Sequence, residues 1–261
     1  YAVKCGEISE VQINNMLAQS RQRLENLEKL NKNTPVEYTD RNLKETGIVA
    51  VVTGEGLAKI FRSLGVDEII PGGQTMNPSI QDIFEAVGKV KANEVIILPN
   101  NKNVILTAGQ VKELIDVPIA VVATKTILQG IASLIAYNPM KNLLENMEAM
   151  TLAANKIKSV EITFAVRDAK VGEQEIKAGE IIGLLDGEIE LIGTSPEQVL
   201  LSILENNLSP GDSFVSIYFG ADVSLSEAEQ LQATLTQLYP NVTVELYDGG
   251  QPLYYYLCSI E

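Results

Sequence analysis

The segment Pro71–Ser79, with the sequence PGGQTMNPS, carries residue types that suit the binding of a small anion or polar ligand. It follows an apolar run that predicts a strand and precedes apolar residues at helical spacing from Ile80 onward. The glycine pair Gly72–Gly73 would leave backbone N–H groups uncovered. Asn77 followed by Pro78 is typical of an N-cap and a first helical residue. A glycine loop at a helix N-terminus binds anions readily. The segment thus predicts the edge of a site, although it also fits a loop shaped for packing or for a partner.

Three more polar segments follow predicted strands. Thr53–Gly56 is a turn with two glycines. Asn100–Asn103 has three amides and an amine that suit a polar ligand, but they suit a helix N-cap and turn equally well. Lys125 lies between two threonines, where it could meet a phosphate or carboxylate, although a solvated lysine at a helix start is the preferred interpretation.

The carboxyl ends of parallel strands meet at one edge of a sheet, and ligands bind there. We therefore expect the four segments to form one polar rim that contacts a ligand or a partner. The residues of this polar rim are Thr53, Gly54, Glu55, Gly56, Gly72, Gly73, Gln74, Thr75, Asn77, Ser79, Asn100, Asn101, Thr124 and Lys125.

Several reaction types are excluded or disfavoured by what the sequence lacks. The chain has no histidine, which rules out a Ser-His-Asp or Cys-His triad and any zinc site that uses imidazole. It has no GxxxxGK[ST] motif, and no GxGxxG follows a predicted strand, which argues against direct nucleotide binding. No carboxylate pair stands out as an acid–base couple and no metal-ligand spacing is convincing. We assign no catalytic residue and no metal ligand.

Composition and charge predict a soluble globular protein. The 261 residues are 46% hydrophobic and 21% charged, and the net charge of −14 disfavours nucleic acid and anionic lipid surfaces as partners. No apolar run reaches the ~18 residues of a membrane helix. Two cysteines, Cys5 and Cys258, suit a reducing compartment, and the N-terminus does not resemble a signal peptide, so we expect a cytoplasmic location. Because the sequence lacks an initiator Met, we expect it to be part of a longer protein.

The order of predicted elements indicates an α/β protein. Residues 46–137 alternate strands with helices, which predicts βαβ units and a parallel sheet. Residues 138–261 predict a second, α+β domain with a mixed sheet. Residues 1–45 predict a helix over 14–31 and a linker, and the leucines of that helix either pack on the next domain or form a helical pairing surface.

A second Gly-Gly-Gln sequence and a run of three tyrosines near the C-terminus can be explained by structure alone. Gly249–Gln251 repeats the Gly-Gly-Gln sequence between two predicted strands, where we favour a hairpin turn over a site. In the following strand, a period of two would put Tyr254 and Tyr256 on one face and Tyr255 on the other. Core and cross-strand packing would explain these tyrosines without a ligand, and an aromatic docking surface is the alternative.

Four strings of the sequence resemble the C-terminal region of the bacterial fatty acid kinase A subunit. This family is also described as dihydroxyacetone kinase-like or Dak-phosphatase proteins. The strings are Gly47–Thr53, Gly72–Ser79, Leu98–Asn101 and Gly249–Tyr256. The resemblance runs from about residue 8 to the end of the chain. The eight-residue string that begins at Gly72 makes it specific.

The resemblance implies that the functions are divided among the domains of a longer chain. The family has an N-terminal nucleotide-binding kinase domain, a middle domain with a Cys/His metal site, and this C-terminal part. The resemblance places Tyr1 just past a His-x-His pair of the middle domain, which agrees with the lack of histidine here. We therefore expect no cofactor in this part, with ATP and magnesium bound in the missing N-terminal domain.

The resemblance also implies a role for this part. The whole protein would transfer phosphate from ATP to a fatty acid held by a separate acyl-binding subunit. The C-terminal part resembles the DegV-like acyl-binding family and the dihydroxyacetone-binding subunit in fold, but it lacks the histidine that holds dihydroxyacetone covalently. We expect a non-catalytic module that docks the DegV-like partner and supports assembly, with a homodimer also possible for it. The alternative is a small-ligand or phosphate-binding domain with its own site at the polar rim.

Overall fold

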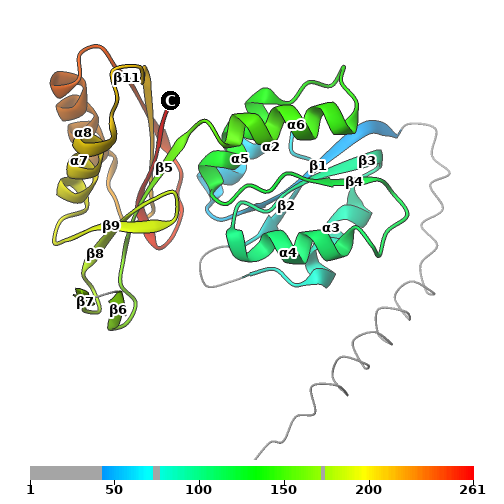
Figure 1. The fold of residues 1–261 in the computed structure, drawn as a ribbon, viewed down its shortest axis with the longest axis horizontal. Helices are drawn as coiled ribbons and strands as arrows, with labels where there is room; N and C mark the ends of the chain where they lie inside the picture. The colour runs from blue at the N-terminus through cyan, green and yellow to red at the C-terminus, as the bar shows by residue number, and fades with distance from the viewer. Residues whose placement is uncertain (1–42, 73–76, 172–173) are drawn as a thin grey trace, which may run out of the picture. The chain divides into compact units, whose positions relative to one another are not determined.

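The computed structural model describes residues 43–72, 77–171 and 174–261. The described residues belong to one compact unit that contains a four-stranded sheet, a six-stranded sheet and a small two-stranded sheet of β6 (Ala169–Val171) and β7 (Gln174–Ile176) (Figure 1). The helix predicted over 14–31 and its linker as far as residue 42 lie outside the described residues, as do Gly73, Gln74 and Thr75 of the polar rim.

The four-stranded sheet is parallel throughout, as the alternation of strands and helices predicts, with the order β2-β1-β3-β4. Its central strand is a continuous β-branched and alanine run that is buried on both faces. Ile48, Ala50 and Val52 face one hydrophobic cluster, whereas Val49 and Val51 face another. The strands are β1 (Lys44–Val52), β2 (Glu68–Pro71), β3 (Ala92–Leu98) and β4 (Ile119–Val121).

Helices cover both faces of this sheet. One face packs against α2 (Glu55–Ser63), α5 (Ile127–Ala136) and α6 (Leu143–Ala154), through residues such as Phe61, Leu128 and Met150. The other face packs against α3 (Ile80–Lys89) and α4 (Lys102–Val111). Helices α2, α3, α4 and α5 each follow a strand and run back from its carboxyl end, so their N-termini gather at one edge of the sheet (Figure 1).

The six-stranded sheet is mixed, with the order β11-β10-β12-β5-β8-β9, and confirms the predicted α+β second half. Only β10 and β11 pair in parallel. One face packs against α7 and α8, whereas Tyr218 and Leu257 on the other face join the cluster around β1. The elements are β5 (Lys158–Phe164), β6 (Ala169–Val171), β7 (Gln174–Ile176), β8 (Ile181–Leu185), β9 (Glu188–Gly193), α7 (Pro196–Asn207), β10 (Phe214–Phe219), α8 (Leu225–Leu238), β11 (Thr243–Asp248) and β12 (Tyr254–Ile260).

The expectation of a hairpin turn at Gly249–Gln251 is wrong. β10 lies between β11 and β12 in the sheet, so the segment crosses from an edge strand over β10 to an inner strand. The strands that flank a hairpin turn must be neighbours, which a local sequence pattern cannot establish here. The crossing also brings the segment against the start of α2.

The expected alternation of the tyrosines is also wrong. The pairing of β12 with β5 shifts its register between Tyr254 and Tyr256. A bulge of this kind moves the following side chains to the other face of the strand. Tyr254 therefore packs against the β1 cluster, whereas Tyr255 and Tyr256 both pack on the α7–α8 side.

Helix α3 begins two residues later than the Asn-Pro pair predicts. Its N-cap is Ser79, whose hydroxyl accepts from the backbone of Asp82 while the Asp82 carboxylate accepts from Ser79. This reciprocal capping box satisfies the first helical N–H groups and displaces Asn77 and Pro78 from the helix. The same hydrogen bonds lower the pKa of Asp82 below its usual value.

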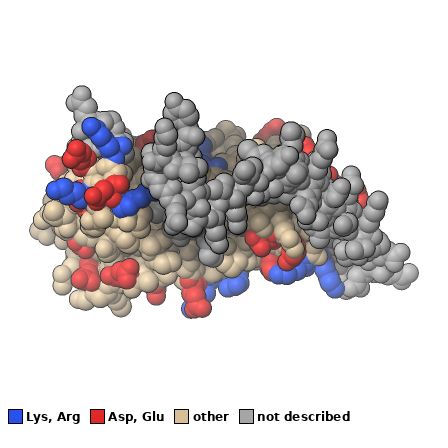
Figure 2. Space-filling view, turned by 90° about the horizontal axis from the view of Figure 1, so that it is seen from below, with Lys and Arg blue, Asp and Glu red and all other residues tan. Residues whose placement is uncertain are grey.

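Among the described residues, none of the helices combines the length and apolarity needed to cross a bilayer. Figure 2 shows one face of the molecule, and on the part not drawn in grey the basic side chains are interspersed with acidic ones. Cys258 is buried and unpaired, and burial raises the pKa of its thiol.

Candidate functional site

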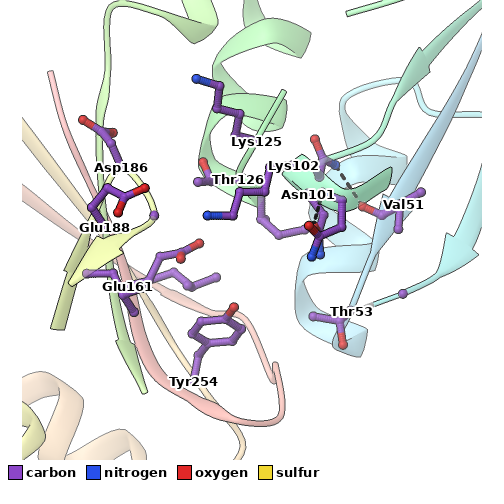
Figure 3. Close-up of a pocket in the computed structure, with 17 residues that line it drawn as sticks. Val51, Thr53, Asn101, Lys102, Lys125, Thr126, Glu161, Asp186, Glu188 and Tyr254 are labelled. Atoms are coloured by element: carbon purple, nitrogen blue, oxygen red, sulfur yellow. Dashed lines mark hydrogen bonds between the residues drawn. The ribbon is translucent and has the colours of Figure 1, made fainter. Parts of the chain in front are cut away.

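A cavity of about 380 Å³ lies between the carboxyl edge of the parallel sheet and the near face of the mixed sheet. We call it the charged cavity, because lysines line one side and carboxylates the other (Figure 3). Its size falls within the ~300–1,000 Å³ usual for ligand pockets. The polar rim contributes Thr53, Gly72, Asn100, Asn101 and Lys125 to its lining.

The basic side of the charged cavity comes from the starts of α4 and α5. Lys102 is the first residue of α4, and Asn101 caps that helix by accepting from the Asn103 backbone N–H. Lys125 precedes Thr126, which caps α5. Figure 3 shows Lys102 extending across the cavity toward the side that carries Glu161. Two lysines and two helix N-termini give this side a positive potential.

The acidic side comes from the mixed sheet. Glu161 lies on β5, paired with Leu257 of β12 on one side and Leu184 of β8 on the other, and all three line the cavity. Asp186 and Glu188 line it from the β8–β9 turn. The Asp186 carboxylate accepts from the Ser159 backbone N–H at 2.9 Å.

Glu161 is the most perturbed carboxylate among the described residues. Burial, reinforced by the negative charge of Asp186 and opposed by Lys102, raises its pKa to about 7. The side chain is partly buried and makes no hydrogen bond or ion pair within the described part of the chain. The neighbouring Tyr254 also lines the cavity, and its burial and the charge of Glu161 raise the pKa of its hydroxyl.

Asn100 and Thr124 of the polar rim bind to the protein itself. The Asn100 side-chain amide donates to the carbonyl of Val51 at 2.9 Å. Its backbone N–H donates to the Thr124 hydroxyl at 3.0 Å, and that hydroxyl donates back to Asn100 Oδ1 at 2.8 Å. Asn100 has a φ of 53°, a left-handed conformation that asparagine tolerates better than most residues. These bonds join the ends of β1, β3 and β4.

Gly54, Glu55 and Gly56 do not line the charged cavity, because the Gly249–Gln251 crossing packs onto them. The Gly249 carbonyl accepts from the Leu57 backbone N–H at 2.9 Å. This bond satisfies an N–H group in the first turn of α2, because the N-cap residue Gly54 has no side chain that could do so. A Cβ on Gly54 would lie 2.7 Å from the Gln251 backbone, and one on Gly56 would lie 2.1 Å from the Asp248 carbonyl. Both positions therefore require glycine.

The remaining described residues of the polar rim lie at its margin. Asn77 is exposed and accepts a long hydrogen bond of 3.5 Å from Asn101, and Ser79 is committed to the α3 cap. Gly72 donates to the Val52 carbonyl at 3.2 Å and lines the cavity. The structure therefore brings five polar-rim residues to the charged cavity and uses the other described residues of the rim in caps and contacts.

The acidic side is what the sequence analysis missed. Glu161 looks like an ordinary alternating residue of a strand, and Asp186–Gly187 looks like a turn. The only local signal was the polar position of Glu161 between two apolar residues, Val160 and Ile162. The described residues contain no group of three or more cysteine, aspartate or glutamate side chains that could hold a metal ion.

Residues 47–261 match the family model for the C-terminal region of proteins that are like the A subunit of fatty acid kinase. The chain belongs to this family. Protein YloV of Bacillus subtilis is 40% identical over 264 aligned residues, which cover all of this chain and 46% of that protein. The chain thus spans about half the length of the curated relatives it matches.

Solved structures confirm the fold that the resemblance implied. A DegV family protein from Corynebacterium glutamicum aligns with a TM-score of 0.61 at 11% identity, covering 83% of this chain and 97% of that one. The fatty acid kinase B3 protein of Streptococcus pneumoniae, solved with linoleic acid, aligns at 0.55 and 12% identity, covering 83% and 98%. The dihydroxyacetone kinase of C. freundii aligns at 0.56 and 12% identity, covering 97% and 57%.

Proposed function

We propose that this part of the chain is the docking and assembly module of the larger component of a two-component fatty acid kinase. In this proposal a DegV-like partner carries the fatty acid, and the polar rim, with its adjoining surface, contacts that partner. The observation that carries the proposal is the family match over residues 47–261.

The chemistry of the charged cavity supports a non-catalytic role. A phosphotransferase needs groups that hold a nucleotide and magnesium. The chain lacks the nucleotide-binding glycine motifs, and the described carboxylates form no three-residue metal cluster. We therefore propose that ATP and magnesium bind in another part of the longer protein.

The charged cavity is also a poor site for a free fatty acid. Glu161, Asp186 and Glu188 would repel a fatty acid carboxylate from one side. In the protein solved from S. pneumoniae the linoleic acid belongs to the B3 protein. A division in which the partner holds the acyl chain and this module holds the partner agrees with both observations.

The exposed faces of the neighbouring helices α5 and α6 give the module further surface for a partner. Ile135, Leu144 and Leu152 are exposed on these helices, and Met140 is exposed in the loop between them. Apolar side chains that gather on a surface are typical of protein interfaces. We include this surface in the area adjoining the polar rim.

A deletion tests the proposal in the longer kinase protein. That protein without residues 47–261 should still bind ATP but should lose acyl-phosphate formation with its partner by about tenfold or more, because docking is lost. Retained ATP binding shows that the truncated protein has folded. If the truncated protein binds the partner and forms acyl phosphate as the intact one does, the proposal is wrong.

A further inference from the structure

We propose that the charged cavity binds a small zwitterion, with its anionic group between Lys102 and Lys125 and its ammonium group against Glu161. This site goes beyond the docking function and does not depend on it. The ligand class is a compact molecule that carries an amine and a carboxylate or phosphate at opposite ends. The argument rests on how charge is distributed over the two sides of one cavity.

The opposite charges face each other without pairing. Neither lysine forms an ion pair within 4.0 Å of a described carboxylate, although other lysines on this protein do, such as Lys158 with Asp212 at 3.1 Å. Figure 3 shows that Lys102 starts from α4 and extends across the space toward Glu161 on β5, yet the two side chains form no ion pair within 4.0 Å. The cavity thus has basic and acidic side chains in its lining that do not pair with each other, and a ligand that carries both charges could bind between them.

Glu161 supplies the strongest single indication of a ligand. A carboxylate set between Leu184 and Leu257 loses hydration, and a desolvated carboxylate without a partner is costly. The Glu161 side chain is only partly buried, so it stays open to the cavity and a ligand bound there can pair with it. An ammonium group would hold Glu161 ionised, since a nearby opposite charge lowers the pKa of a carboxyl.

The anionic end of the ligand has its own site. Asn101 and Thr126 each accept from one first-turn N–H of α4 and α5, and Lys102 and Lys125 lie beside these helix starts in the cavity lining. A simple anion could bind here, but it would leave Glu161 unpaired and would face the charges of Asp186 and Glu188. A molecule with both charges satisfies both sides at once.

Matched probes test the zwitterion directly on the full 261-residue chain. 6-Aminohexanoate has both groups, hexanoate lacks the amine, and hexylamine lacks the carboxylate; 4-aminobutanoate checks a shorter span. Binding is measured by calorimetry, or by ligand-observed NMR where affinity is weak. We expect one of the two amino acids to bind about tenfold more tightly than either single-charge probe.

Two variants test which end of the ligand each charged side chain binds. Glu161→Gln should weaken the amino acid about tenfold and leave hexanoate unchanged, and Lys102→Met should weaken both. Glu113→Gln and Lys112→Met carry the same charge changes next to the end of α4, outside the cavity lining, and should change nothing. Thermal unfolding of each variant establishes that it is folded.

Two outcomes would overturn the proposal. If hexanoate binds as tightly as 6-aminohexanoate and Glu161→Gln has no effect, the cavity is an anion site. If neither amino acid binds at about 10 mM to the folded chain, the opposing charges do not form a zwitterion site of this span.

Discussion

Asn100 and Thr124 bond to each other twice, once through the Asn100 backbone N–H and once through its side-chain oxygen. With the third bond to Val51, this pair fastens the carboxyl ends of three parallel strands. Both residues were expected on the ligand-binding rim, and the structure uses their polar atoms to hold that rim in place. The charged cavity thus lies at an edge of the sheet that these hydrogen bonds hold together.

Removing Asn100 should destabilise the protein because it leaves buried polar groups without partners. We expect Asn100→Ala to lower the free energy of unfolding by about 2–4 kcal/mol. Chemical denaturation measures this, and a double-mutant cycle with Thr124→Val should give a coupling of about 1 kcal/mol or more. Asn103→Ala, at an exposed position beside Asn101, is the control and should change stability by less than about 0.5 kcal/mol. Additive effects of the Asn100 and Thr124 changes would contradict this account.

The backbone contact between Gly54 and Gln251 should be equally sensitive. Gly54 has a φ of 89°, and a Cβ there would lie 2.7 Å from the Gln251 backbone. We expect Gly54→Ala to destabilise the protein by about 2 kcal/mol or more in thermal or urea unfolding. Gly88→Ala is the matched control, because a Cβ on that helical glycine meets nothing within 4 Å. It should stabilise by up to about 1 kcal/mol. Equal effects of the two changes would argue against the contact.

Glu161 predicts an unusual dependence of stability on pH. Its folded-state pKa of about 7 is raised above the ordinary value of 4.5, so the folded state favours the protonated form. The resulting destabilisation is absent below about pH 4.5, grows as pH rises and is complete above about pH 7, where it reaches a few kcal/mol. Since the chain has no histidine, few other groups titrate in the upper part of this interval.

The variant Glu161→Gln removes this titration and provides the measurement. Its free energy of unfolding, relative to the unmodified chain, should rise by on the order of 2 kcal/mol between about pH 5 and about pH 8 in urea titrations. Glu113→Gln should show no such trend. A difference that stays constant over this interval would mean that Glu161 is ionised in the folded protein at low pH.

The sequence predicted the parallel sheet because its signal is local. The run Ile48–Val52 is apolar at every position, and a helix follows each strand, which leaves few alternatives to βαβ units. The crossing at Gly249–Gln251 and the bulge before Tyr256 depend on which strand lies next to which. That order is a property of distant pairings, which turn residues and alternation do not encode.

The candidate site was also predicted only in part, for the same reason. Its basic side follows from helix starts after strands, and Asn101 and Lys125 were predicted there. Its acidic side depends on β5 pairing with β8 and β12, which turns Glu161 toward the other sheet. No residue near Glu161 in the sequence indicates that partner, so only the assembled fold shows the opposing charges.

The docking proposal meets its most direct test in a titration of this chain against the acyl-binding protein of the same organism, loaded with fatty acid and followed by calorimetry. The account predicts saturable binding of one partner per chain with a Kd of about 100 µM or tighter. No heat change and no co-elution at high micromolar concentrations of both proteins would contradict it.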